Sequence, residues 1–316
     1  MTQKIHLKKE PVLRKKHEAF SYQAEAVSAI KDLNYAAVFH EQGLGKSKIA
    51  IDLALYWLEK KTVDTVLLVV KKNLLYNWIK EFKIHAFLRP KLLTQNKKDN
   101  YFVFNSPSRL ILTHYEVFNS ETARLKLFLK SRNIAVILDE STKIKNPAAR
   151  LTQAFFELAP LFKKRIIMTG TPVANRPFDI WSQIWFLDQG KSLGNNFSEF
   201  KGKTNLSNEL TGNRPAQQIF EDEISEIFSK ISWFSVRETK NSGVIELPEK
   251  IVESIKTDWE HYQADLYRQI RDDLRVIVVK EGLPADDNED DLLKRLRRFV
   301  QVASNHRFID ESYLYE

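Results

Sequence analysis

Residues 35–47 join an apolar run to a short glycine-containing loop that could hold a phosphate group. The segment reads YAAVFHEQGLGKS and ends in Lys46 and Ser47. Glycine at 43 and 45 would let backbone N–H groups close on phosphate oxygens without a Cβ in the way. Lys46 could reach the β- and γ-phosphates, Ser47 could ligate Mg²⁺, and the following helix would point its positive end at the anion. The residues expected to contact a nucleotide here are Gln42, Gly43, Leu44, Gly45, Lys46 and Ser47.

The loop pattern is incomplete, because His40 stands where the full pattern has its first glycine. Taken alone, the segment could be a chance Gly-x-Gly-Lys-Ser turn. A second apolar run at 134–138 changes this, since it leads directly into Asp139 and Glu140, about ninety residues after the loop. In phosphate-loop ATPases an acid at the end of a neighbouring strand holds Mg²⁺, and an adjacent glutamate can polarise the attacking water. A solvated strand end is the alternative for the acids alone, but the two segments together favour ATP hydrolysis.

Composition and length exclude several classes of protein. The chain has 316 residues, 43% of them apolar, which is enough for one large or two modest domains. It has no cysteine, so there is no disulfide scaffold or thiol nucleophile, and a reducing, cytoplasmic compartment is expected. The basic N-terminus has no apolar core of the kind that a secretory signal needs, and no window approaches eighteen apolar residues. We therefore expect no membrane association.

The net charge of +8 is unevenly distributed along the chain. Residues 1–100 carry a net +9 and residues 101–200 a net +5, whereas residues 201–316 carry a net −6. A polyanion would be expected to dock on the first two thirds of the chain. Ordinary lysine-rich solubility explains the same numbers, so the charge supports nucleic-acid binding only together with the motifs.

Five short apolar runs separated by helix-like stretches predict a parallel sheet with helices on both faces. These runs are 35–39, 65–70, 109–113, 134–138 and 165–168. Ligand-binding residues in such sheets gather at the carboxyl ends of the strands, and the polar residues discussed here follow the runs in that way. Lys71, Lys72 and Asn73 directly follow a run, so they could meet a nucleic-acid phosphate at this edge.

The composition of the sequence changes near residue 190. Residues 190–215 are rich in Gly, Asn and Ser, which is typical of loops, and two amphipathic helical stretches follow further on. We therefore expect a nucleotide-binding lobe over residues 1–190 and a mainly helical extension over residues 191–316.

With these segments in order, the chain resembles the first RecA-like lobe of the superfamily 2 helicases, in particular the Swi/Snf-like DNA translocases. In that branch the first loop glycine is normally absent, so His40 is no longer an anomaly. The tail Lys143, Lys145 and Asn146 is also a feature of this branch. The segments that carry the resemblance are FSYQAEAV, VFHEQGLGKS, LLVVKKNLLYNWIKEF, ILTHYE, LDESTKIKN and MTGTPVANRPFDIWSQIWFL.

The resemblance implies a P-loop (RecA-like) α/β fold and an ATP-binding lobe of a double-stranded DNA translocase that uses Mg²⁺. It implies catalytic roles for Lys46, Asp139 and Glu140, with Ser47 and Asp139 at the metal. Tyr22 and Gln23 would read adenine, and the turn Thr169, Gly170 and Thr171 would relay the phosphate state to the DNA. The residues implied to contact DNA are Lys71, Lys72, Asn73, Thr113, His114 and Tyr115.

Three departures from the family pattern matter. Thr142 stands where the family usually has the histidine of its Asp-Glu-x-His motif, which puts the coupling of nucleotide to DNA in doubt. Lys71 replaces the usual proline and adds charge beside the presumed DNA path. The chain also lacks any match to a second RecA-like lobe and its arginine finger. We therefore expect this chain alone to bind ATP but to hydrolyse it very slowly.

Two other functions remain open at this point. One is a strand-separating or RNA-dependent helicase, which Asn77-Trp78 and the Lys-x-Lys-Asn tail disfavour. The other is a nucleotide-sensing DNA-binding module without hydrolysis, which Thr142 favours and the preserved acid pair disfavours.

Overall fold

The computed structural model describes residues 7, 9–173, 176–204, 214–244, 251–256, 258–281 and 289–304. The chain forms two compact units, Met1–Leu247 and Pro248–Glu316, and each is described by itself. Among the described helices, none combines the length and the apolar character that crossing a bilayer requires.

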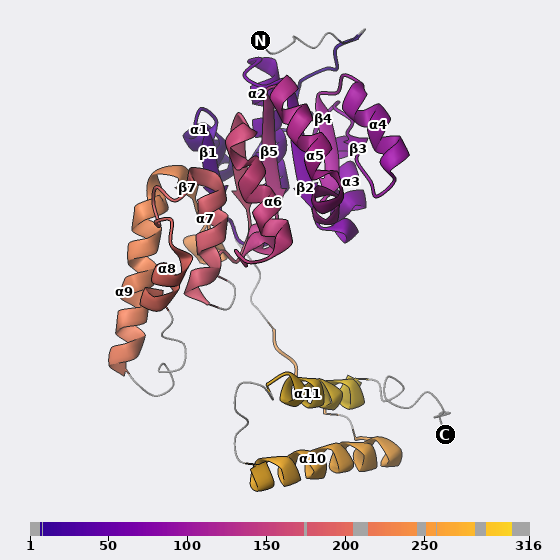
Figure 1. Cartoon of the computed structure of the whole chain (residues 1–316), viewed down its shortest axis with the longest axis vertical. Coiled ribbons are helices and arrows are strands. Elements are labelled where there is room, and N and C mark those ends of the chain that lie inside the picture. The colour runs from indigo at the N-terminus through magenta and orange to yellow at the C-terminus, as the bar shows by residue number, and fades with distance from the viewer. Residues whose placement is uncertain are drawn as a thin grey trace. The chain divides into compact units, whose positions relative to one another are not determined.

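The first unit contains a seven-stranded sheet in which every neighbouring pair of strands is parallel (Figure 1). The strand order β3-β4-β2-β5-β6-β1-β7 places β1 between β6 and β7. The central strands are buried along their whole length, which explains why they read as continuous apolar runs rather than alternating ones. The strands are β1 (Tyr35–Val38), β2 (Thr65–Val70), β3 (Lys91–Leu92), β4 (Leu110–His114), β5 (Ile134–Asp139), β6 (Lys164–Met168) and β7 (Ser235–Val236).

Helices cover both faces of the sheet, as the sequence predicted (Figure 1). Successive strand residues point to opposite faces, so Ile134, Val136 and Leu138 of β5 join one core cluster while Ala135 and Ile137 join the other. One cluster is completed by α1 (Ser21–Ile30), α2 (Lys46–Glu59) and α3 (Leu75–His85). The opposite cluster is completed by α5 (Tyr115–Ser131), α6 (Arg150–Leu158), α7 (Trp181–Asp188) and α9 (Arg214–Ile231), while α4 (Lys97–Asn105) and α8 (Phe197–Thr204) contribute partly buried side chains to it.

The first unit extends beyond the boundary that composition suggested near residue 190. Strand β7 pairs with β1 in register Ala37 with Ser235 and Val38 with Val236. Ile227 and Ile231 of α9 belong to the same core cluster as the central strands. The composition suggested a boundary because residues 190–215 resemble a loop. Residues beyond this segment nevertheless pair with β1 and pack in the core, so the compact unit ends at Leu247.

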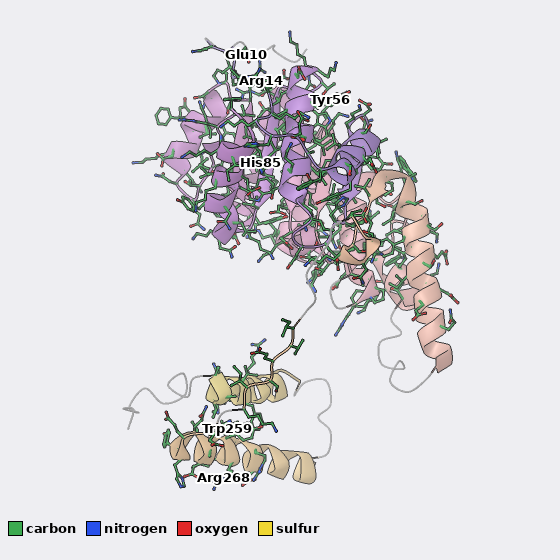
Figure 2. The ribbon with its side chains drawn as sticks, turned by 180° about the vertical axis from the view of Figure 1, so that it is seen from behind. Glu10, Arg14, Tyr56, His85, Trp259 and Arg268 are labelled. Atoms are coloured by element: carbon green, nitrogen blue, oxygen red, sulfur yellow. The ribbon has the colours of Figure 1, made fainter. Side chains whose placement is uncertain are left out.

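The second unit is a pair of helices, α10 (His261–Glu281) and α11 (Glu289–Ser304). Trp259 precedes α10 and is labelled in Figure 2. Its ring lies edge-on to Tyr267 at 4.5 Å between centroids, and the Tyr267 ring lies 4.8 Å from that of Phe299. Gln263 Nε2 donates to the backbone oxygen of Val302 at 2.6 Å. Aromatic packing and this hydrogen bond therefore join the two helices.

Candidate nucleotide-binding site

The loop between β1 and α2 has the backbone conformation of a phosphate cradle. Gly43 and Gly45 have φ of +87° and +70°, which L side chains rarely adopt. A Cβ at Gly45 would also lie 2.1 Å from Gln23 Nε2, so a side chain at this position would displace the Gln23 amide from the loop. Helix α2 begins at Lys46, directly after Gly45, and its first N–H groups are positioned to meet an anion in the loop.

The Lys46 side chain folds back onto this loop. Its ammonium donates to the backbone oxygens of His40 at 2.9 Å and Glu41 at 3.1 Å. Burial lowers the pKa of Lys46, and the carboxylates of Glu140, Asp139 and Glu41 oppose that shift. The ammonium thus lies within reach of both the loop and the acid pair, where phosphate oxygens could replace the carbonyls as acceptors.

Asp139 ends β5 and is 8% exposed. Burial raises the pKa of Asp139, and the Glu140 charge adds to the rise. Three groups lower this pKa: Trp78 Nε1 donates to Asp139 Oδ2 at 2.8 Å, the Lys46 ammonium lies nearby, and the Glu140 backbone N–H donates to the carboxylate. This tryptophan is therefore part of the site as well as of the core.

Glu140 has the left-handed backbone conformation, with φ +53° and ψ +55°. For a residue other than glycine this conformation costs of order 1–3 kcal/mol and is concentrated at functional sites. The turn directs the chain away from the sheet immediately after the strand. Glu140 Oε2 lies 3.8 Å from Lys71 Nζ, at the end of the neighbouring strand β2.

The turn Thr169–Thr171 follows β6, which lies between β1 and β5. Thr169 donates its N–H to the backbone oxygen of Val38 at 3.1 Å. A Cβ at Gly170 would lie 3.2 Å from the Gln42 nitrogen and 3.4 Å from Lys46 Nζ. The turn therefore contacts the phosphate loop directly, and Gly170 permits that close approach.

Tyr22 and Gln23 lie on α1 beside the loop, and both are buried. Gln23 Oε1 accepts from the Phe20 N–H at 3.1 Å, and Gln23 Nε2 donates to Tyr22 Oη at 3.2 Å and to the Leu44 oxygen at 3.4 Å. The amide thus ties α1 to the loop. Adenine recognition by this pair stays a prediction, since the amide would have to exchange one of these partners for the base.

The residues predicted to contact DNA fall into two groups. Lys72 and Asn73 are exposed and Lys71 is partly exposed, all at the carboxyl end of β2. By contrast, Thr113, His114 and Tyr115 are at most 3% exposed.

The contacts of the buried group explain this burial. Thr113 Oγ1 donates to the Leu93 oxygen at 3.2 Å, and His114 Nδ1 lies 2.6 Å from Glu116 Oε2. Tyr115 Oη donates to the backbone oxygen of Asp139 at 2.8 Å. These three side chains are therefore held in the interior and are not presented to DNA in this structure.

One buried contact network was not predicted from the sequence. Ser141 Oγ donates to Gln183 Oε1 at 2.7 Å, and Gln183 Nε2 donates to the backbone oxygens of Pro172 at 3.1 Å and Asp179 at 3.0 Å. Ser141 and Gln183 are fully buried. The amide thus joins the segment after the acid pair to the segment after the Thr169–Thr171 turn. Both residues lie in segments that carry the family resemblance, LDESTKIKN and MTGTPVANRPFDIWSQIWFL, but nothing in their spacing predicts that they contact each other.

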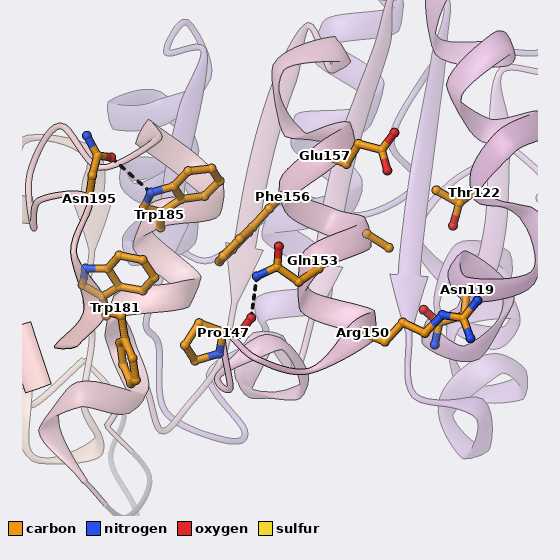
Figure 3. A pocket seen from close by; sticks show the side chains of 12 residues that line it. Asn119, Thr122, Pro147, Arg150, Gln153, Phe156, Glu157, Trp181, Trp185 and Asn195 are labelled. Carbon is orange, nitrogen blue, oxygen red and sulfur yellow. Dashed lines mark hydrogen bonds between the residues drawn. The ribbon is translucent and has the colours of Figure 1, made fainter.

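A separate hollow of about 880 Å³ lies over α5, α6 and α7 (Figure 3). Phe156, Trp181 and Trp185 form its aromatic side, with Phe156 and Trp185 4.2 Å apart between ring centroids. The Trp181 indole N–H is buried and lacks a hydrogen-bond partner among the described residues. None of the described lining residues belongs to the loop, the acid pair or the turn, so this hollow is distinct from the nucleotide site.

The residues present fit a nucleotide with Mg²⁺. Gly43 and Gly45 leave the cradle free of side chains, and Gly170 keeps its rim open. The Ser47 hydroxyl and the Asp139 carboxylate are oxygen donors, which Mg²⁺ prefers, and one or two such ligands suffice because the phosphates and water supply the others.

Comparisons with known proteins agree with this geometry. Residues 22–308 match the family model described as the SNF2-related domain. The chain is 27% identical over 315 residues to the "Probable ATP-dependent DNA helicase CHR12" of Arabidopsis thaliana, covering 95% of this chain and 27% of the relative. It is 29% identical over 294 residues to an ATP-dependent helicase of Mycoplasma genitalium, covering 90% of this chain and 27% of the relative. The chain therefore spans about a quarter of the length of these relatives.

The fold is also similar to a solved structure, the SWI2/SNF2 ATPase core of Sulfolobus solfataricus in complex with double-stranded DNA. The TM-score is 0.61 at 24% identity, covering 95% of this chain and 61% of the other. This likeness confirms the predicted RecA-like architecture. The matched family model covers the phosphate loop, the acid pair, the turn and the helices that follow, so the chain belongs to the SNF2-related domain family.

Proposed function

We propose that this chain is the ATP-binding lobe of a motor that uses ATP hydrolysis to move along double-stranded DNA. The observation that carries the proposal is the meeting of Lys46, Gly170 and the acid pair at one edge of the sheet. Two relatives of this chain carry the name ATP-dependent helicase, which supports the use of ATP. A similar solved structure is a complex with double-stranded DNA, which supports DNA as the partner. We also propose that the protein acts in the cytoplasm.

In this reading, the loop N–H groups and Lys46 bind the phosphates, and Ser47 with Asp139 would hold Mg²⁺. When bound, the metal neutralises charge on the transferred phosphoryl group. Glu140 orients the attacking water, for which its position at the strand end beside Asp139 is suited. The Thr169–Thr171 turn senses the occupant of the loop through Gly170.

DNA would meet the same edge of the sheet through Lys71, Lys72 and Asn73. A motor must step over any sequence, so its contacts should go mainly to backbone phosphates, and its affinity should fall with salt. The partial pairing of Lys71 with Glu140 at 3.8 Å places a DNA-binding candidate next to the predicted catalytic carboxylate.

Turnover at the rate of a motor would require a second RecA-like lobe that supplies an arginine finger. Such a residue is worth roughly 10³–10⁵ in turnover. We therefore expect this 316-residue chain to bind ATP and ADP while hydrolysing ATP very slowly, with or without DNA.

The test is ATPase activity of the full-length protein with double-stranded DNA, single-stranded DNA and RNA, alongside Glu140→Gln. A motor should show stimulation by double-stranded DNA, and Glu140→Gln should abolish turnover while leaving ATP affinity unchanged. Strand displacement or stimulation by RNA alone would instead indicate a helicase. A protein without turnover, on which Glu140→Gln has no effect, would indicate a nucleotide-sensing module and refute the proposal.

A further inference from the structure

The segment that follows β7 lies alongside the phosphate loop, although nearly 200 residues separate the two in sequence. The Phe39 N–H donates to the Val236 oxygen at 2.8 Å, and the Glu41 N–H donates to the Glu238 oxygen at 2.9 Å. These bonds continue the β1–β7 pairing past the ends of both strands. Backbone hydrogen bonds therefore hold residues 236–238 against the start of the loop.

The next residues bring a lysine over the tip of the loop. The Lys240 N–H donates to Glu41 Oε2 at 2.6 Å, which fixes its backbone to the loop. A Cβ built on Gly43 would lie 3.9 Å from Lys240 Cε, and no other described residue beyond the chain neighbours comes within 4 Å of that point. The aliphatic stem of Lys240 thus lies against the conformationally unusual Gly43.

The charge of Lys240 is available to a ligand. The residue is exposed, and within the described part of the chain its ammonium makes no hydrogen bond or ion pair. Lys46 differs, because its ammonium already contacts two loop carbonyls. An anion seated in the loop could therefore take the Lys240 ammonium as a partner, since the end of this side chain lies against Gly43.

The strand order decides which phosphates Lys240 would reach. Asp139, Glu140 and Gly170 follow β5 and β6, on one side of β1, whereas Lys240 follows β7 on the other side. Resting on the proposed function, in which the γ-phosphate faces the acid pair, this order puts Lys240 beside the rest of the phosphate chain. We propose that the Lys240 ammonium binds the α- and β-phosphates, so that the loop holds the nucleotide between two lysines.

Nucleotide titration of the 316-residue chain tests this proposal. The dissociation constants of Mg-ADP and Mg-ATP are measured for the wild type, Lys240→Ala and Lys240→Arg, with Lys60→Ala as the control. Lys60 is an exposed lysine at the far end of α2. We expect Lys240→Ala to weaken both nucleotides equally, by roughly tenfold, as for one partly screened charged contact. Lys240→Arg should retain most of the affinity, and Lys60→Ala all of it.

Salt and melting measurements complete the test. The difference between the wild type and Lys240→Ala should shrink as salt rises, because the contact is exposed, while the melting temperature without nucleotide stays unchanged. Equal affinities for wild type and Lys240→Ala would overturn the inference, and so would a loss confined to ATP. A wild-type chain that binds neither nucleotide would overturn the proposed function as well.

Discussion

At the scale of single residues, the ionised carboxyl of Asp139 is costly to bury, and we propose that it is used in catalysis. Its carboxyl is 8% exposed and lies beside Glu140, and burial is the main cause of its raised pKa. The Trp78 indole and the Lys46 ammonium offset part of this cost. A buried carboxylate with a shifted pKa is more common at functional sites than elsewhere, which fits the proposed role of Asp139.

We predict that Asp139→Asn stabilises the nucleotide-free chain while it removes function. The folded state holds the Asp139 proton more tightly than the unfolded chain, so ionisation costs stability above the raised pKa, and this cost vanishes as the pH falls below the ordinary carboxyl value. Asparagine can still accept from Trp78. The melting temperature should therefore rise at pH 8 and the gain should shrink towards pH 4.

Activity of the full-length protein provides the second measurement for Asp139→Asn. Turnover should fall by roughly 10²-fold or more, the loss typical of removing one stabilising group from an active site. A melting temperature that drops at pH 8, or turnover near the wild-type rate, would show that this carboxylate is structural.

At the scale of elements, β5 and β6 are joined at their carboxyl ends through α7. Gln183 of α7 accepts from Ser141, after β5, and donates to the backbone oxygens of Pro172 and Asp179, beyond the turn after β6. Lys145 Nζ also pairs with Asp179 at 2.9 Å. The position of the family's usual histidine, here Thr142, lies directly after Ser141. This buried amide therefore provides a physical link between the acid pair and the turn.

We predict that Gln183→Leu weakens the stimulation of ATPase activity by DNA in the full-length protein. Leucine fills the space but leaves the Ser141 hydroxyl and two backbone oxygens without their partner, at a cost of about 1–3 kcal/mol in unfolding free energy. DNA stimulation should fall about 2- to 30-fold, with ATP affinity retained. Gln153→Leu is the matched control, because the exposed Gln153 side chain on α6 bonds only the Pro147 oxygen among the residues that the structure describes.

The double variant Ser141→Ala/Gln183→Leu separates coupling from simple destabilisation. If the two side chains act as one link, the losses in DNA stimulation should be far from additive. Additive losses, or a Gln153→Leu protein with the same defect, would contradict the link.

At the scale of the whole molecule, the positive charge is concentrated in the part of the chain that forms most of the sheet. The positive excess lies in residues 1–200, which supply most of the sheet, while residues 201–316 are net negative. Exposed Lys72 and Asn73 follow β2 at the edge where the phosphate loop also lies. The carboxyl edge of the sheet, where we propose that nucleotide binds, therefore also presents positively charged side chains that could contact DNA.

We predict that the chain binds double-stranded DNA with an affinity that falls steeply with salt and depends little on sequence. Lys72→Ala should weaken binding of all duplexes alike and reduce the slope of log K against log salt by about 1, because one phosphate contact is lost. Lys60→Ala removes an equal charge at the far end of α2 and should leave the slope unchanged. Equal slopes for Lys72→Ala and the wild type would place the DNA elsewhere.

The sequence alone determined the central strands, the phosphate loop and the acid pair. These features are local, since each is a continuous apolar run followed by a few polar residues, and a parallel sheet brings such run ends to one edge. The helices on both faces of the sheet were predicted because helix-like stretches separate the apolar runs. Positions of Lys46, Asp139 and Gly170 in the structure agree with that prediction.

Only the tertiary structure decided which of the motif residues are accessible and which distant residues join the site. Thr113, His114 and Tyr115 follow the pattern of strand-end residues, yet all three are buried. No local pattern predicts the contacts of Lys240 and Gln183, because backbone pairing of a two-residue strand and the packing of α7 bring them to the edge. Burial and long-range pairing depend on every element at once, so spacing along the chain does not encode them.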